Sequence, residues 1–231
     1  MTALAWLMIA VGAIAQATTG FGFSLVSAPF LIAAYGAPLG VQLNLVLAVA
    51  INIGLLVRRA RTADVHHALV LLVPAALATV AVGAAIRNVD HGPLTIVAGI
   101  VCLAGTAALA SGATFRRLEG RVATAAVGAA SGAMNVTAGI GGPPIALFAV
   151  NAGWSPEIAR PTMQLFFLGI NAVALMTLGM PDELPLGAVA AVAIGLLVGR
   201  LALQRVPDGA IRRLTLALAA IGSVLAILRG L

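Results

Sequence analysis

The chain has 231 residues, of which 61% are hydrophobic and 9% are charged, and its mean hydropathy is +1.11. This composition leaves too few polar side chains to cover a water-soluble globule, so it excludes a soluble globular protein and predicts an integral membrane protein. All 13 basic residues are arginines, in short clusters without interleaved aromatic residues. We therefore interpret the net charge of +6 as a membrane-topology signal, and we expect no nucleic-acid partner.

Ten helical segments are expected in chain order, each an apolar run bounded by charged residues, glycines or prolines. The first five cover residues 2–19, 24–35, 39–57, 65–86 and 94–114. The second five cover residues 122–135, 144–150, 158–178, 186–203 and 210–228. Segment 24–35 would be only about 18 Å long, well short of a bilayer core of about 30 Å, so it is expected to be a half-helix or a tilted helix. Ser24 is its expected N-cap.

Two stretches place helix-breaking glycines and prolines inside long apolar runs. The first is residues 18–29 and the second is residues 135–148. They match at three pairs that are each 119 positions apart, namely Thr18 with Thr137, Gly20 with Gly139 and Gly22 with Gly141. An internal duplication is the simplest explanation, and it predicts two membrane repeats, residues 1–115 and 116–231, of about five helical segments each.

The arginine clusters predict the orientation of these repeats, because loops rich in arginine face the cytoplasm. The clusters are Arg58, Arg59 and Arg61; Arg116, Arg117 and Arg121; and Arg200, Arg205, Arg212 and Arg213. The loop with Asp182 and Glu183 has no arginine and is expected outside. Segment 39–57 then runs inward and its counterpart 158–178 runs outward, so the repeats have inverted topology and both termini face the outside.

Inverted repeats with interrupted helices at matching positions are typical of transporters, whose sites lie at the repeat interface. The expected fold is therefore all-α and membrane-integral, with the two broken-helix hairpins meeting near the midplane. Each short helix would carry about half a positive charge at its N-terminus, so two facing N-termini could hold a small anion. The prolines suit a first helical turn, where N–H groups lack partners. Lone glycines such as Gly128 and Gly132 are better explained as close helix packing.

The expected substrate-binding residues are the two breaks and the polar side chains near them: Thr18, Thr19, Gly20, Phe21, Gly22, Phe23, Ser24, Asn44, Asn135, Thr137, Gly139, Gly141, Gly142, Pro143, Gln164 and Asn171. Gln16, Ser27, Gln42 and Asn52 are further polar neighbours, and for the amides in segments 39–57 and 158–178 a role as interhelical hydrogen-bond donors and acceptors stays equally open.

No nucleophile–base set, metal-ligand spacing or nucleotide-binding loop falls inside the segments, so we expect no enzyme, no catalytic or metal-binding residues and no cofactor. All seven acidic residues lie at segment ends or in loops, which argues against a buried carboxylate proton relay. Protons as a coupling ion and assembly into oligomers are left open.

The chain resembles the TauE/SafE family of sulfite and organosulfonate exporters. The resemblance rests on the hairpin from Thr19 to Ser24 followed by Pro29, on its counterpart from Gly139 to Pro144, and on the stretch from Val198 to Pro207, and it spans nearly the whole chain. It implies export of sulfite, sulfonates or other small organic acids across the bacterial cytoplasmic membrane. A non-transporting membrane scaffold and an anion channel remain alternatives.

Overall fold

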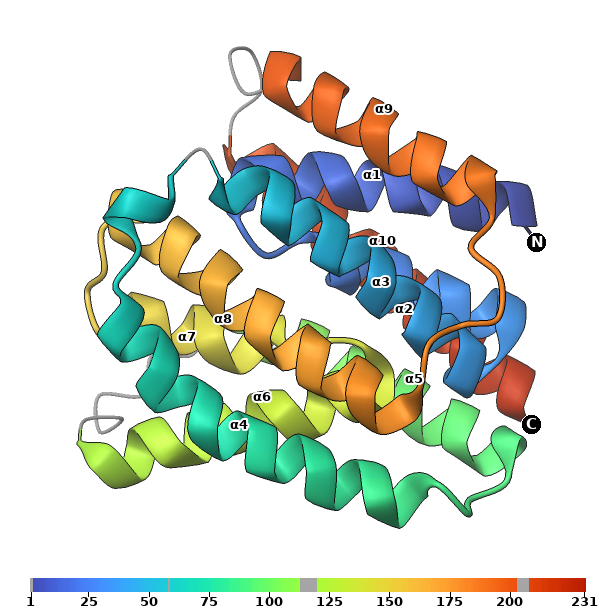
Figure 1. Cartoon of the computed structure of the whole chain (residues 1–231). Coiled ribbons are helices and arrows are strands. Elements are labelled where there is room, and N and C mark those ends of the chain that lie inside the picture. Colours follow the sequence, from blue (N-terminus) through green and yellow to red (C-terminus); the bar gives the residue numbers. More distant parts are fainter. Residues whose placement is uncertain (1, 58, 113–119, 203–207) are drawn as a thin grey trace.

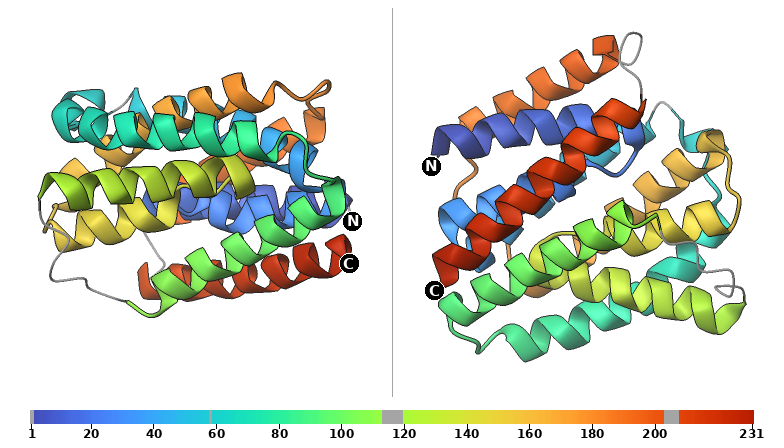
Figure 2. Two further views of the ribbon diagram at one scale, coloured as in Figure 1. Left: turned by 90° about the horizontal axis from the view of Figure 1, so that it is seen from below. Right: turned by 180° about the vertical axis from the view of Figure 1, so that it is seen from behind.

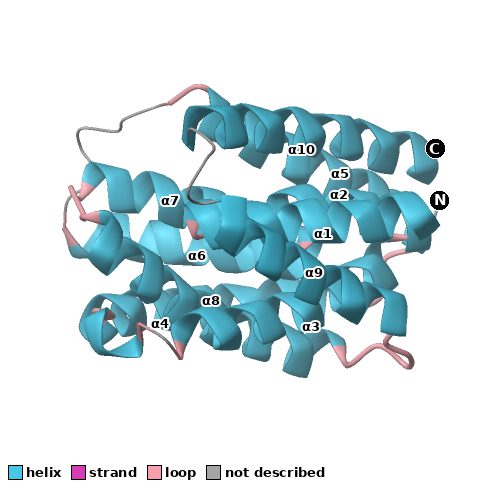
Figure 3. Cartoon of the chain, turned by 90° about the horizontal axis from the view of Figure 1, so that it is seen from above, coloured by secondary structure: helices cyan, strands magenta, loops and turns pink. Residues whose placement is uncertain are grey.

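The computed structural model describes residues 2–57, 59–112, 120–202 and 208–231. Helices make up nearly all of this part of the chain, and no strand occurs in it (Figure 3). The α-helices of the first half are α1 (Thr2–Thr19), α2 (Phe23–Tyr35), α3 (Ala37–Leu56), α4 (Val65–Ile86) and α5 (His91–Ala110), with the short 3-10 helix η1 (Ala60–Thr62) between α3 and α4. Those of the second half are α6 (Arg121–Ala138), α7 (Gly142–Asn151), α8 (Pro156–Leu178), α9 (Leu186–Ala202) and α10 (Asp208–Gly230).

Each expected helical segment is confirmed, and the differences lie at the ends. The fifth segment begins at His91 rather than at residue 94, because Pro93 is accommodated in the first turn of α5. The sixth continues to Ala138, where Gly139 adopts a left-handed φ of 69° and ends the helix. The assignment of Ser24 as an N-cap is wrong: α2 begins one residue earlier, and its N-cap is Gly22, which has no side chain to cap it.

Within the described ranges five helices, α3, α4, α5, α8 and α10, are long and apolar enough to cross a membrane. The two helices that follow the breaks are much shorter, with 13 residues in α2 and 10 in α7. At 1.5 Å per residue they reach only about 20 and 15 Å, so each ends within a bilayer core of about 30 Å. The chain is therefore a multi-pass membrane protein that contains two half-length helices.

The fourth helix of each half packs against the opposite half (Figure 1). One apolar core joins α1, α2 and α3 to α9, and a second joins α6, α7 and α8 to α4. Between these cores α3 lies beside α8 (Figure 1), and α5 lies beside α10 in both views of Figure 2. Helices of the first half and of the second half thus share their apolar cores.

Glycines bring α6 onto α4 at very short range, as the sequence predicted for Gly128 and Gly132. A β-carbon on Gly132 would overlap the carbonyl oxygen of Ala75 and lie 2.8 Å from its carbonyl carbon. In the same way, a β-carbon on Gly195 of α9 would overlap the carbonyl oxygen of Ala10 in α1. Small residues at such contacts let membrane helices pack closely enough for dispersion forces to hold them together.

The arginines of the described residues are divided unevenly between the two ends of the helix bundle. Arg59, Arg61, Arg121, Arg160, Arg200, Arg212 and Arg213 lie at the end where α3 and α9 finish and α6, α8 and α10 begin. The loop with Asp182 and Glu183, the start of α1 and the end of α10 lie at the opposite end (Figure 1). The predictions for Arg58, Arg116, Arg117, Glu119 and Arg205 fall on residues outside those described. Which end faces the cytoplasm stays a prediction.

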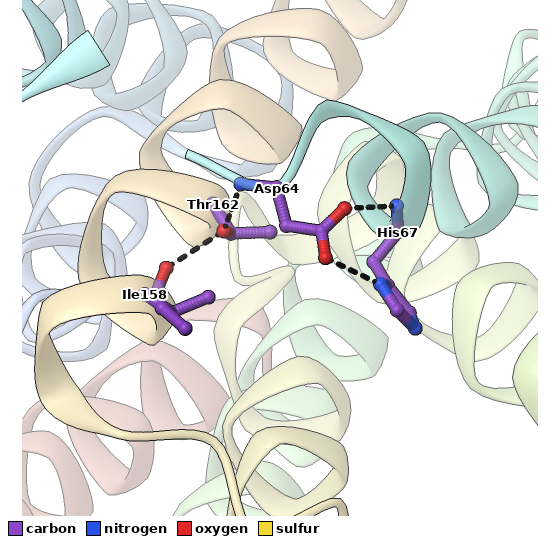
Figure 4. A network of polar contacts seen from close by, with 4 residues as sticks. All are labelled: Asp64, His67, Ile158 and Thr162. Atoms are coloured by element: carbon purple, nitrogen blue, oxygen red, sulfur yellow. Dashed lines mark hydrogen bonds and ion pairs between the residues drawn. The ribbon is translucent and has the colours of Figure 1, made fainter. Parts of the chain in front are cut away.

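At the arginine-rich end a polar cluster joins the start of α4 to α8 (Figure 4). Asp64 accepts a hydrogen bond from the backbone N–H of His67 at 3.0 Å, and its other carboxylate oxygen lies 2.7 Å from Nδ1 of the same residue. The backbone N–H of Asp64 donates to Thr162, whose hydroxyl donates to the carbonyl oxygen of Ile158. The hydrogen bonds from His67 hold the pKa of the Asp64 carboxyl below its ordinary value.

Replacing Asp64 by alanine should lower the free energy of unfolding by about 0.5–2 kcal/mol, the usual cost of losing an N-cap. Because the folded pKa is lowered, the contribution of the carboxylate is fully present above its ordinary pKa of about 3.9 and is lost as the pH falls through the lower folded value. Thermal unfolding in detergent at pH 7 and below pH 4 tests this. The variant Asp64→Asn should keep most of the cap and lose its pH dependence; equal melting of all three proteins at pH 7 would contradict the assignment.

Candidate functional site

The two breaks lie side by side inside the protein. Asn44 in α3 joins them, because its amide donates to the hydroxyl of Ser24 at the start of α2 and to the carbonyl oxygen of Gly139 in the second break, each at 3.0 Å. A β-carbon placed on Gly142 at the start of α7 would lie 3.5 Å from the carbonyl oxygen of Phe21 in the first break. The N-terminal ends of both half-length helices therefore approach the same small volume.

That volume is a cavity of about 20 Å³, which we call the central cavity. It is lined by residues of α1, α2, α3, α6, α8 and both breaks: Gln16, Phe21, Phe23, Ser24, Ala48, Asn52, Asn135, Gly141, Gly142, Phe167 and Asn171. A cavity of this size holds about one water molecule. The observed conformation is therefore closed around the two helix starts, and a larger ligand requires the lining side chains to move apart.

Two amide pairs form the polar wall of the central cavity. The amide of Gln16 donates to Asn52 at 3.2 Å, and the amide of Asn135 donates to Asn171 at 3.0 Å. The members of each pair are 36 positions apart, and the second pair follows the first by 119 positions, the same offset as the glycine matches. Each half thus supplies an equivalent hydrogen bond to the site.

Gln16 has two further partners. Its carbonyl oxygen accepts the backbone N–H of Phe23, the first residue of α2, at 3.0 Å. Its amide also donates to Gln164, whose own amide donates to the carbonyl oxygen of Gly20 at 2.7 Å. Through Gln16 the start of α2 is joined to α1, α3 and α8. No buried polar side-chain atom of the described residues lacks a hydrogen-bond partner.

The structure places the expected site residues in three groups. Lining the central cavity are Phe21, Phe23, Ser24, Asn135, Gly141, Gly142 and Asn171. Next to it, through hydrogen bonds or as part of a break, are Gly22, Asn44, Gly139 and Gln164. Elsewhere are Thr18, bonded within α1; Thr19, in a cavity that Arg160 and Arg212 also line; Pro143, in a cavity between α5, α6 and α7; Thr137, in a cavity at the end opposite the arginine-rich end; and Gly20, in the large cavity at the arginine-rich end.

Four lining residues were not among the expected site residues: Gln16, Ala48, Asn52 and Phe167. The offset of 119 could have found two of them, since it pairs Gln16 with Asn135 and Asn52 with Asn171. Ala48 and Phe167 carry no polar signal, so the sequence offered no way to distinguish them from other apolar residues of their helices.

Two larger cavities lie at opposite ends of the bundle. The arginine vestibule has a volume of about 490 Å³ and is lined by Gln16, Ala17, Gly20, Gly54, Leu55, Arg59, Arg160, Pro161, Gln164, Ala193, Leu196, Leu197 and Arg200. The cavity at the other end has about 210 Å³ and includes Arg87, His91, Thr137 and Thr177. The arginine vestibule therefore reaches the first break, at Gly20, and the cavity at the other end reaches the end of α6 before the second break.

The described residues contain no group of three or more histidine, cysteine, aspartate or glutamate side chains placed to hold a metal ion. Their carboxylates lie at helix ends or in loops: Asp64 and Asp90 precede α4 and α5, Glu157 is in the first turn of α8, and Asp182 and Glu183 precede α9. The polar groups that line the central cavity are thus amides, a hydroxyl and the backbone.

These features define a multi-pass helical membrane protein with two interrupted helices that meet at a buried polar site. A family model described as Sulfite exporter TauE/SafE matches residues 4–226. The chain therefore belongs to the TauE/SafE sulfite exporter family, a family of membrane transporters, and the resemblance seen in the sequence is confirmed. No curated protein and no solved structure matches the chain.

Proposed function

We propose that this protein is a secondary transporter that exports a small anion, such as sulfite, a sulfonate or another small organic acid, across the bacterial cytoplasmic membrane. The observation that carries the proposal is the meeting of the starts of α2 and α7 at one buried polar cavity. Backbone exposed by a break in a membrane helix must line a cavity or a ligand, because lipid cannot accept its hydrogen bonds. A substrate site formed where two interrupted helices meet is typical of secondary transporters.

Neutral groups can hold an anion at this place. The two helix starts together supply about one positive charge, and the amides of Gln16, Asn52, Asn135 and Asn171 can reorient to donate hydrogen bonds. Hydrogen bonds to a charged group contribute about 1.5–3 kcal/mol each, so several would offset much of the cost of removing water from the anion. The central cavity of about 20 Å³ is too small for such an anion, so binding requires the lining side chains to move apart.

The proposal includes two inverted repeats, residues 1–115 and 116–231, with both termini outside. Three features support it: the shared offset of 119, the equivalent pairs Gln16–Asn52 and Asn135–Asn171, and the exchange of α4 and α9 between the halves. The excess of arginine at the end where α3 finishes supports a cytoplasmic location for that end.

Flux of sulfite into proteoliposomes tests the proposal. The wild-type protein should give saturable flux and counterflow above protein-free vesicles. The variant Gly141→Ala should lower flux, because its β-carbon would lie 3.1 Å from the hydroxyl of Ser131 and 3.2 Å from the amide oxygen of Asn135 beside the cavity. A scaffold would show no flux in either protein, and a channel would show flux without saturation or counterflow. An imposed pH gradient in the same vesicles tests proton coupling.

A further inference from the structure

Three arginines from three different elements converge on the arginine vestibule. Arg59 follows α3, Arg160 lies in the first turns of α8, and Arg200 lies in the last turn of α9. Arg59 and Arg200 are exposed, whereas Arg160 is half-buried. These residues are far apart in the chain, and only the packing of α3, α8 and α9 around one cavity brings them together.

The arginines of this cavity have no carboxylate among the described residues that line it. The ion pair found in the described part of the chain, between His67 and Asp64, lies outside this cavity. Glu157 interacts electrostatically with Arg160 and Arg59 but closes no ion pair with either. A guanidinium group offers paired N–H donors that match the oxygens of an oxoanion, and apolar walls strengthen such contacts by excluding water. Leu55, Ala193 and Leu196 supply those walls.

The floor of the vestibule is also the wall of the central cavity. Gln16 lines both, and its hydrogen bond to Gln164, together with that from Gln164 to Gly20, closes the passage between them. An anion held in the vestibule would therefore be one layer of amide side chains away from the starts of α2 and α7. Breaking the hydrogen bond from Gln16 to Gln164 would free an N–H of Gln16 to donate to the anion, and Gln164 would become a second donor if its amide also left the carbonyl oxygen of Gly20.

We propose that Arg59, Arg160 and Arg200 form a binding site for an oxoanion of the size of sulfite or phosphate, from which the anion passes to the central cavity. The role in passage rests on the proposed transport function, whereas the binding site does not. The alternative is that these arginines only fix the orientation of the protein in the membrane. That role suffices for Arg61, which is exposed at the same end and does not line the vestibule.

Binding to protein purified in detergent tests the site directly. Sulfite and inorganic phosphate, added at constant ionic strength, should raise the melting temperature of the wild type, since a ligand held by the folded form stabilises it. Each of Arg59→Gln, Arg160→Gln and Arg200→Gln should weaken the apparent affinity about ten- to hundredfold, the effect of losing a charged hydrogen bond. The matched control Arg61→Gln removes the same charge at the same end and should change the affinity less than about twofold. Equal weakening by all four substitutions, or by none, overturns the proposal.

The phosphate group of a lipid could bind the same arginines, and a second experiment distinguishes it from a free anion. The same proteins are titrated with short-chain phosphatidylglycerol and with short-chain phosphatidylcholine. Stabilisation by phosphatidylglycerol alone, without any response to sulfite or phosphate, would identify a lipid site and overturn the passage of a free anion. Arginine-dependent binding without sulfite flux in proteoliposomes would support the site and contradict the transport function. Sulfite flux that is unchanged in the three arginine variants would support the transport function and contradict the passage of the anion through the arginine site.

Discussion

Sulfite flux in proteoliposomes should fall about a hundredfold or more when Gln16 is replaced by leucine. The substitution removes the acceptor of the Phe23 backbone N–H and the donor to Asn52 and Gln164. Hydrogen bonds to a charged ligand are worth about 1.5–3 kcal/mol each, and a factor of ten in binding is 1.4 kcal/mol, so loss of the two amide donations alone accounts for this size. The unpaired partners should also lower the melting temperature of the variant.

Gln42 offers a matched control, because it is also a glutamine of a membrane helix with one long-range hydrogen bond, to the carbonyl oxygen of Leu178, and it lines neither the central cavity nor the vestibule. Gln42→Leu should lower the free energy of unfolding by about 0.6 kcal/mol, the average contribution of such a hydrogen bond in a membrane protein, and it should keep wild-type flux. A monodisperse Gln16→Leu protein with wild-type flux would show that the first hairpin does not bind the transported anion.

Replacing Gly132 by leucine should prevent the chain from folding, and replacing it by alanine should lower the melting temperature by roughly 3–10 °C. Even one β-carbon meets the backbone of Ala75, which can give way only if α4 moves as a whole. Overpacking of a tight contact costs about 1–3 kcal/mol, and in a chain of this size each kcal/mol shifts the melting temperature by about 2–4 °C. Thermal unfolding and size-exclusion chromatography in detergent measure both effects.

Two further alanine variants serve as controls for Gly132→Ala. Gly195→Ala should be destabilised to a similar degree, because a β-carbon there overlaps the carbonyl oxygen of Ala10 and lies 2.7 Å from the β-carbon of Ala13. Gly209→Ala should leave the melting temperature unchanged or slightly raised, because nothing lies within 4 Å of its added carbon. If the melting temperature of Gly132→Ala equals that of Gly209→Ala rather than that of Gly195→Ala, the close contact of α4 with α6 is not what holds the two helices together.

The helices could be predicted because the bilayer imposes a simple rule on sequence. A membrane-spanning segment needs about 20 apolar residues and must satisfy its own backbone, so arginines, glycines and prolines mark its ends. The fourth segment was predicted at residues 65–86 and is α4, Val65–Ile86. The error at Ser24 arose because a serine after a break can cap a helix or sit within its first turn, and the choice depends on Asn44, which bonds that hydroxyl from another helix.

The candidate site was predictable only in part. Asn135 and Asn171 were found because they are polar residues near a break or within an apolar segment, and they line the central cavity together. Gln16 was seen as a neighbour but not as a site residue, since one glutamine in a helix does not reveal which helices face it. Arg59 and Arg200 were assigned to clusters that report topology, and Arg160 was not singled out, because an arginine at a helix end usually reports topology.

The amino-acid sequence alone determined that the chain lies in a membrane, that it forms ten helical segments, and that two of these are interrupted at matching positions. These properties depend on hydropathy and on backbone preferences that act within about twenty neighbouring residues. Tertiary structure alone decided that α4 and α9 pack against the opposite halves, and that Arg59, Arg160 and Arg200 share one cavity. In lipid every apolar helix face is equally well solvated, so partners are chosen by shape at contacts such as Gly132 on Ala75, which exist only once the helices meet.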